Sequence, residues 1–323
     1  MNLNEFMIKK KAVGLLSGGL DSTLAAKVLI DIGIEVHAIN FVSPFCTCTP
    51  KTMGCSAVSR AIEQLGGIPL KRVSLGDDYL RMVKSPKHGY GRGINPCIDC
   101  RIMKIRKAAE FMNEIGASFL FTGEVLGQRP MSQHRKAIGL IDKESGMSGL
   151  ILRPLSAAHF EPTIPEINGI VDRAKLLDFQ GRSRKPQISL AKDKNIIDYP
   201  CPNGGCLLTD VRFAERLNNY FSGKKEVSVK DMPLLKIGRH QKTSDGKNVI
   251  IARNEQECEI LQKLSVSDMI TYVPQNFSGP VIVTESVFTE EIAGLFRKYG
   301  KAGGEGANTV TSLKEGVVST HLV

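Results

Sequence analysis

A short apolar run ends in a serine, two glycines and an aspartate at residues 13–22, where the sequence is V-G-L-L-S-G-G-L-D-S. The apolar composition of 12–16 predicts a buried parallel strand, and the apolar spacing of 22–32 predicts the helix that follows it. Glycines let an anion approach backbone N–H groups, and the start of a helix adds unsatisfied donors and a positive dipole end. The stretch therefore predicts a phosphate-binding loop in which Asp21 can hold Mg²⁺. The residues expected around the phosphates are Ser17, Gly18, Gly19, Asp21 and Ser22.

Strand-like and helix-like segments alternate after this loop. Apolar runs favour strands at 35–41, 70–74, 119–122 and 150–153. Apolar spacing favours helices at 56–65, 97–115, 131–141, 165–177 and 186–194. The alternation predicts an α/β fold, a doubly wound parallel sheet with helices on both faces, in which ligands bind at the carboxyl ends of the strands.

The pattern changes after Cys206. A helix is expected at 207–220 and a linker at 222–225. Short strands at 234–237, 249–252 and 281–283 then predict a small α+β domain. Because the chain is long enough for two cores, we expect one domain at 1–221 and a second at 222–323.

The net charge of +10 is distributed unevenly, with +9 in residues 1–221 and +1 in residues 222–323. Residues 81–107 carry eight Lys and Arg against one acid, Asp99, and residues 182–194 carry five against Asp193. Such a surface suits a polyanionic partner. No apolar run approaches the ~20 residues of a membrane helix, and the first five residues are not typical of a signal peptide. We therefore expect a cytoplasmic protein without a membrane partner.

Eight cysteines in a chain of this class indicate metal or redox chemistry in a reducing compartment rather than a disulfide framework. Cys97 and Cys100 open the helix at 97–115, where backbone donors are expected to lower the pKa of a thiol. Cys206 ends a turn-rich loop, C-P-N-G-G-C, which is expected to leave its thiol accessible. These three thiols are the first group of candidate ligands or nucleophiles.

Three chemistries are open to this group. A C-x-x-C pair and one distant cysteine can hold three irons of a four-iron, four-sulfur cluster and leave the fourth iron open for sulfide. Alternatively, Cys97 or Cys100 carries a persulfide that Cys206 resolves by disulfide exchange. The third is a structural zinc held by these three cysteines and Cys201. A second group fits no zinc spacing and is open as another metal site, a sulfur relay or a set of structural thiols: Cys46, Cys48 and Cys55.

The loop S-G-G-L-D-S at 17–22 resembles the PP-loop of N-type ATP pyrophosphatases, which cleave ATP between the α and β phosphates and pass AMP to an acceptor oxygen. It lacks the lysine of a P-loop, so transfer of the γ-phosphoryl group is not favoured. Three further strings make the chain similar to the PP-loop domain of tRNA 4-thiouridine synthetases: T-G-E-V-L-G-Q at 122–128, M-S-Q at 131–133 and L-R-P-L at 152–155.

Two cysteine loops extend this resemblance. N-P-C at 95–97 and G-C at 205–206 are similar to the cysteine loops of tRNA-specific 2-thiouridylases. The resemblance to these PP-loop enzymes covers roughly residues 10–215. Residues 234–264, which include G-R-H and I-A-R-N, are similar to the NFACT-type RNA-binding domain.

The resemblance implies an ATP-dependent tRNA sulfurtransferase, in which a uridine carbonyl oxygen attacks the α-phosphate, pyrophosphate leaves, and sulfide or a persulfide displaces AMP. The implied cofactors are ATP, Mg²⁺ and an iron–sulfur cluster. The implied partners are tRNA, bound by the basic loops, and a sulfur donor, either sulfide or the persulfide of a cysteine desulfurase. The implied catalytic residues are Cys97, Cys100, Cys206 and Asp21. Further nucleotide contacts are expected from Asn40 and Phe41 beside the adenine, and from Thr122, Gly123 and Gln128.

Several questions stay open at this point. No segment is typical of a THUMP domain or of a rhodanese, so we expect the C-terminal domain to supply RNA contacts and the sulfur route to be internal. The uridine, its C2 or C4 position, and the choice between a single chain and a homodimer are open. One alternative is a PP-loop pyrophosphatase with a small-molecule acceptor, against which the basic loops argue. Another is an inactive, nucleotide-responsive RNA-binding protein, against which the intact Ser17, Asp21 and Ser22 argue.

Overall fold

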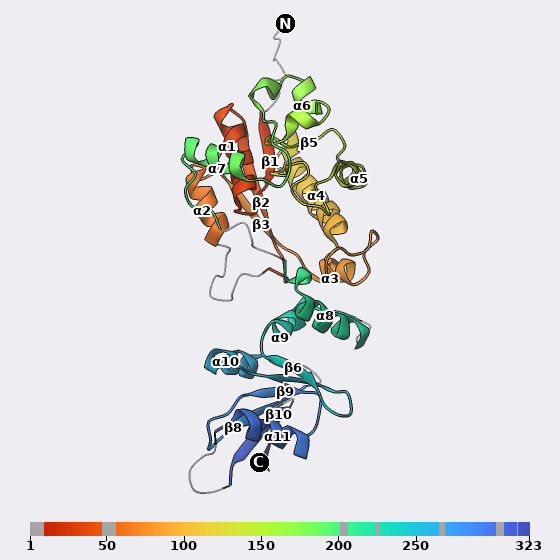
Figure 1. Ribbon diagram of the computed structural model, residues 1–323, viewed down its shortest axis with the longest axis vertical. Coiled ribbons are helices and arrows are strands. Elements are labelled where there is room, and N and C mark those ends of the chain that lie inside the picture. The colour runs from red at the N-terminus through yellow and green to blue at the C-terminus, as the bar shows by residue number, and fades with distance from the viewer. Residues whose placement is uncertain are drawn as a thin grey trace. The chain divides into compact units, whose positions relative to one another are not determined.

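The computed structural model describes residues 10–46, 56–200, 206–223, 226–264, 269–301, 307–314 and 316–323. The chain divides into two compact units, Met1–Ala214 and Glu215–Val323 (Figure 1). The division lies inside helix α8 (Val211–Gly223), which also contains Ser222 and Gly223. The expectation that a linker begins at residue 222 was therefore wrong, because the helix continues for two more residues.

The first unit is built on a five-stranded sheet with the order β3-β2-β1-β4-β5, in which every neighbouring pair is parallel. Its strands are β1 (Lys11–Leu15), β2 (Glu35–Val42), β3 (Leu70–Ser74), β4 (Phe119–Phe121) and β5 (Ile151–Leu152). The central strand is β1, whose Val13 pairs with His37 of β2 on one side and with Leu120 of β4 on the other. All carboxyl ends consequently lie at one edge, as the sequence predicted.

Helices cover both faces of this sheet (Figure 1). Because side chains alternate along a strand, Ala12 belongs to one core and Val13 to the other. The first core is closed by α1 (Leu20–Asp31), α2 (Ser56–Gln64) and α7 (Lys185–Asp193). The second is closed by α4 (Cys97–Glu114) and α5 (Arg135–Ser145), and α3 (Asp77–Lys84), which was not predicted, packs against α4. The predicted doubly wound architecture is confirmed.

Three predicted helices differ in the structure. The helix expected at 165–177 is only α6 (Ile164–Ile167), because Gly169 follows it with a φ of +68° and ends it, and the 3₁₀ turn η2 (Arg173–Lys175) comes next. Helix α5 begins four residues later than expected because the His134 side chain accepts a hydrogen bond from the Ala137 N–H and caps it. The helix expected at 207–220 is divided into the 3₁₀ turn η3 (Leu207–Thr209) and α8.

The second unit is an antiparallel sheet with the order β11-β10-β8-β9-β7-β6 and helices on both faces. Its strands are β6 (Arg239–Lys242), β7 (Asn248–Ile251), β8 (Ile270–Pro274), β9 (Ile282–Thr284), β10 (Thr309–Lys314) and β11 (Val317–Leu322). Helix α11 (Glu290–Tyr299) covers one face, while α9 (Met232–Lys236) and α10 (Glu255–Lys263) cover the other. The predicted small α+β domain is confirmed.

One strand prediction in this unit was wrong. Residues 234–237 belong mostly to α9, not to a strand, because Pro233 suits the first turn of a helix and lacks the N–H that a central strand needs. Leu234 and Leu235 are buried from this helix. In the part of the chain that the structure describes, no helix has the length and apolar character needed to cross a membrane.

Candidate nucleotide and cysteine site

The loop between β1 and α1 is closed by its own hydroxyl groups. The Oγ atoms of Ser17 and Ser22 are 3.0 Å apart, and the Ser22 hydroxyl also donates to the Gly19 carbonyl at 2.9 Å. Gly18 has a φ of +75°, and a Cβ on it would lie 2.6 Å from the carbonyl carbon of Ala57. Only glycine fits there. Since Gly19 is the N-cap of α1, the unpaired N–H groups of the first helical turn begin at this loop, an arrangement that is suited to binding an anion.

Asp21 stands in the first turn of α1 with one carboxylate oxygen held and the other unpartnered. Its Oδ2 accepts a hydrogen bond of 2.6 Å from the Gln128 amide and lies 3.8 Å from Nη2 of Arg184. Gln128 is in turn fixed by the Gln187 amide at 2.9 Å. Oδ1 of Asp21 is buried and has no hydrogen-bond partner among the described residues. A buried carboxylate oxygen without a partner suits a hard cation such as Mg²⁺.

The two residues expected beside an adenine have different surroundings. The Asn40 amide is buried and donates to the Leu16 carbonyl at 2.8 Å, so it fastens the end of β2 to the beginning of the phosphate-binding loop. Phe41 is half-buried and packs against the core beneath α4. Asn40 thus supports the loop, and Phe41 contributes to the sheet's packing.

Thr122 and Gly123 follow β4 and lie directly against the phosphate-binding loop. A Cβ on Gly123 would be 2.5 Å from the carbonyl carbon and oxygen of Asp21 and from the backbone nitrogen of Ser22. The Thr122 hydroxyl donates to Oε2 of Glu124 at 3.1 Å. The two segments therefore touch backbone to backbone at a point where only glycine fits.

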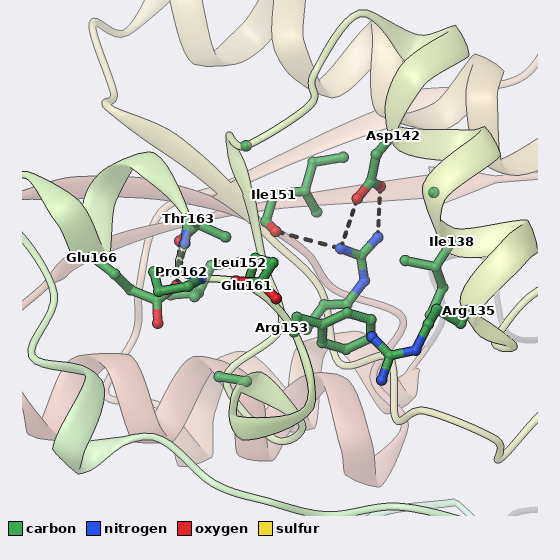
Figure 2. Close-up of a pocket in the computed structure, with 14 residues that line it drawn as sticks. Arg135, Ile138, Asp142, Ile151, Leu152, Arg153, Glu161, Pro162, Thr163 and Glu166 are labelled. Atoms are coloured by element: carbon green, nitrogen blue, oxygen red, sulfur yellow. Dashed lines mark hydrogen bonds and ion pairs between the residues drawn. The ribbon is translucent and has the colours of Figure 1, made fainter.

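Glu124 belongs to a buried ionic network that sequence reasoning did not identify. Oε2 of Glu124 lies 3.1 Å from Nε of Arg153, and Oε1 lies 3.3 Å from Nε of Arg101. Arg153 also donates to both oxygens of Asp142, at 2.7 and 3.0 Å, and Figure 2 shows this pair beside a cavity of about 290 Å³. Burial alone would raise the pKa of Glu124, but Arg101 and Arg153 outweigh it and hold the pKa below its ordinary value.

The two cysteine loops converge through backbone contacts. The Ile94 N–H donates to the Leu208 carbonyl at 3.1 Å, and the Leu207 N–H donates to the Phe45 carbonyl at 3.1 Å. Gly93 has a φ of +66°, and a Cβ on it would lie 2.4 Å from the Leu208 oxygen. These contacts hold the segment after Cys206 beside the loop that leads into Cys97.

The three candidate thiols consequently lie in one neighbourhood. Sγ of Cys100 is 3.4 Å from the hydroxyl of Tyr79, which projects from α3. Burial raises the pKa of Cys97, and Cys100 adds to this effect. Burial also raises the pKa of Cys206 to about 11, with smaller contributions from Cys100 and Cys97. The expectation of a lowered pKa was therefore wrong for Cys97, because loss of hydration outweighs the donors at the helix start.

The structure allows a partial test of the metal hypotheses. Among the described residues, no three His, Cys, Asp or Glu side chains converge closely enough to hold a single metal ion. Cys48, Cys55 and Cys201 lie outside the described residues, and the half-buried Cys46 follows β2. In an iron–sulfur cluster each cysteine binds a different iron, so its thiols need not converge on one point. The zinc hypothesis includes Cys201 and therefore extends beyond the described residues.

Arg129 directly follows Gln128, whose amide donates to Asp21. Burial and neighbouring positive charges lower the pKa of Arg129, while Asp21 and Cys97 both act in the opposite direction. Arg129 is therefore within electrostatic reach of the loop and of the cysteines.

The first unit is an α/β domain in which the central parallel strand leads through a glycine-rich loop into α1, and which also contains the grouped cysteines. Residues 7–171, more than half of the chain, match the family model described as Thiamine biosynthesis protein (ThiI). The chain therefore belongs to the ThiI family. Residues 238–316 match the NFACT protein RNA binding domain. Both matches confirm the family expected from the sequence.

The chain is also similar to curated and solved proteins. It is 24% identical over 249 residues to the tRNA-specific 2-thiouridylase MnmA of Francisella tularensis subsp. tularensis (strain WY96-3418), a match that covers 72% of this chain and 64% of the relative. The MnmA of subsp. novicida (strain U112) matches to the same extent. A solved 4-thiouridine synthetase in complex with RNA and ATP shares 24% identity at a TM-score of 0.38, over 70% of this chain and 52% of that one. The chain thus spans less than two thirds of these relatives' lengths.

Proposed function

We propose that the chain is an ATP-dependent tRNA sulfurtransferase that adenylates a uridine carbonyl and replaces its oxygen with sulfur. The observation that carries this proposal is the link between the loop and the cysteine pair. Gly123 lies against the backbone of Asp21, and the next residue, Glu124, lies 3.3 Å from Arg101, which directly follows Cys100. Membership of the ThiI family and likeness to proteins named tRNA-specific 2-thiouridylases support the same activity. The match of residues 238–316 to an RNA-binding domain supports tRNA as the substrate.

The loop supplies the phosphate-binding half of this chemistry. The backbone N–H groups around Gly18 and Gly19 would bind ATP phosphates, and Oδ1 of Asp21 would hold Mg²⁺. The magnesium ion would neutralise charge on the departing pyrophosphate. Fixed donors that need no rearrangement are suited to stabilising charge as it develops during attack of the uridine oxygen on the α-phosphate. Gln128 acts here by orienting Asp21.

The thiol group supplies the sulfur-binding half. Cys97, Cys100 and Cys206 would hold three irons of a four-iron, four-sulfur cluster, whose open iron would present sulfide to the adenylated base. Sulfide would be the sulfur source; delivery from the persulfide of a cysteine desulfurase would also require a thiol reductant that releases the outer sulfur as sulfide. Tyr79 and the backbone contacts of Gly93 and Ile94 position the thiols in this arrangement.

The activity is tested by mass spectrometry of tRNA nucleosides from an anaerobic reaction containing the purified protein, an unmodified tRNA transcript, ATP, Mg²⁺ and sulfide. We expect a thiouridine that requires ATP, and chromatographic comparison with 2-thiouridine and 4-thiouridine assigns its position. Pyrophosphate release that proceeds equally without tRNA, with no thiolated nucleoside, would contradict the proposal and favour a small-molecule acceptor.

The cluster is tested by changing its ligands one at a time. Anaerobically purified protein is expected to be brown and to contain about four irons per chain, whereas Cys97→Ala and Cys100→Ala are expected to lose most of that iron and the visible absorption. Cys258→Ala is the matched control, because Cys258 lies in α10 of the second unit and should keep the full iron content. Colourless anaerobic protein with one zinc per chain would rule out the cluster.

A further inference from the structure

Three arginines from separate segments lie near the phosphate-binding loop and the segment after β4. We call Arg101, Arg129 and Arg184 the arginine cluster. Arg101 follows Cys100 in α4, Arg129 follows Gln128 in the loop after β4, and Arg184 directly precedes α7. Arg129 is exposed overall, yet its pKa is lowered first by partial loss of hydration and then by the positive charges of Arg101 and Arg184. Contacts support a common location. Gln128, which precedes Arg129, donates to Asp21 at 2.6 Å, and Arg184 lies 3.8 Å from the same carboxylate. Arg101 pairs with Glu124, whose neighbour Gly123 lies against the Asp21 backbone.

The cluster has more positive charge than its surroundings balance. Arg101 lies 3.3 Å from Glu124, and Arg184 lies 3.8 Å from Asp21. Arg129 has no carboxylate: its guanidinium makes no hydrogen bond or ion pair with any residue that the structure describes. Guanidinium groups that repel one another and leave a fork of donors unused are suited to binding an anion, and their planar geometry matches phosphate.

Two sources of phosphate could reach this position, the RNA backbone and ATP. The phosphates of ATP already have backbone donors and the hydroxyls of Ser17 and Ser22 within the loop. The arginine cluster instead includes Arg184, 3.8 Å from Asp21, and Arg101, which directly follows Cys100. In the proposed reaction the uridine oxygen first attacks the α-phosphate of ATP, and sulfur from the cysteines then attacks the same base. The base must therefore lie between ATP and the cysteines, which brings its backbone phosphate near the arginine cluster.

We propose that the arginine cluster binds an RNA backbone phosphate next to the target uridine and thereby places the base between ATP and the cysteines. This inference rests on the proposed function, because it takes RNA as the substrate. Phosphate contacts of this kind fix register without reading sequence. Arg129, whose guanidinium has no other described partner, is the residue that should contribute most.

The test compares tRNA and ATP binding by the full-length protein, without chemistry. Affinity for a fluorescently labelled, unmodified tRNA transcript is measured by anisotropy over a series of KCl concentrations, and affinity for a non-hydrolysable ATP analogue by calorimetry. We expect Arg129→Ala to raise the tRNA Kd about tenfold at low salt. Its plot of log Kd against log[KCl] should lose about one unit of slope. The Kd for the ATP analogue should stay within twofold of the wild-type value.

Lys175→Ala is the matched control, because Lys175 carries the same charge, is exposed in η2 and makes no ion pair with any described residue. It should leave the tRNA Kd and the salt slope unchanged. Arg129→Gln should behave as Arg129→Ala does. Both Arg129 variants should keep or slightly raise the melting temperature, since one of three repelling charges is removed.

The outcomes separate the possible roles. A tenfold rise in the Kd of the ATP analogue, whatever the salt slope, would assign the cluster to ATP and overturn the inference. An unchanged tRNA Kd and salt slope would also overturn it, as would a marked fall in melting temperature, which would indicate a structural role. If the wild-type protein itself binds no tRNA, the proposed function fails and not only this inference.

Discussion

Alanine at position 123 is expected to lower ATP-dependent pyrophosphate release at least a hundredfold. A Cβ on Gly123 would lie 2.5 Å from the backbone of Asp21 and Ser22, and backbone cannot rotate away as a side chain can. The segment after β4 and the phosphate-binding loop must then separate. Displacing reacting groups by about 1 Å can cost on the order of a hundredfold in rate. The measurement is pyrophosphate release by the Gly123→Ala variant with saturating tRNA.

Gly139→Ala is the control for this substitution. Gly139 lies within α5, where a Cβ would meet nothing within 4 Å. It should retain wild-type turnover and gain about 0.5–1 kcal/mol of unfolding free energy, because alanine favours a helix. Turnover of Gly123→Ala within threefold of wild type would mean that the contact between the two segments is not needed.

The second large effect is expected in stability. Arg153→Met should lower the free energy of unfolding by about 3–5 kcal/mol, since it leaves the buried carboxylate of Glu124 with Arg101 alone and Asp142 without its partner. Chemical denaturation at neutral pH measures this loss. Arg135→Met is the control, because Arg135 lines the same cavity and lies over Phe160 but makes no ion pair with any described residue (Figure 2). A loss below about 1 kcal/mol for Arg153→Met would contradict the expected role of the network.

The loss of unfolding free energy in the Arg153→Met variant should depend on pH in a defined direction. In the wild-type protein the pKa of Glu124 is held below its ordinary value of 4.5, so its contribution is present above that pH and is lost as the pH falls. Without Arg153, burial should raise the pKa of Glu124, and folding would then favour the protonated form. The difference between the two proteins should consequently be smallest near pH 4 and should grow towards neutral pH. A difference that stays constant over this range would show that Glu124 is not the group involved.

Local patterns predicted those parts of the fold that depend on neighbouring residues. The strand, the glycines and the helix around Ser17 and Ser22 act within ten residues, and the β3 bounds were predicted at 70–74 as found. The errors arose where one residue decides the outcome, as Gly169 does by ending α6 and Pro233 does by starting α9. Neither effect changes the apolar pattern from which the elements were predicted.

The candidate site was predictable only in its components. Asp21 and Cys97 were both selected from motifs, but Arg129, whose pKa both of them raise, was not, because no spacing in the sequence links residues 21, 97 and 129. Glu124 lies within the string T-G-E-V-L-G-Q, and Arg101 directly follows the C-x-x-C pair. These positions were the only signal in the sequence for the ion pair between the two residues. The raised pKa of Cys97 depends on packing around the thiol, which a helix-start pattern does not report.

The adjacent residues Gly123 and Glu124 have a consequence for how this segment can vary in length. Gly123 touches the phosphate-binding loop, while Glu124 pairs with Arg101 beside Cys100 and with Arg153 beyond β5. One residue inserted between Gly123 and Glu124 would displace the chain by about 3.3 Å. This shift is enough to break either the contact of Gly123 with the loop or the ion pairs of Glu124. Insertions engineered to alter this protein should therefore be placed in exposed turns elsewhere, and the length of the segment from the end of β4 to Glu124 should be kept unchanged.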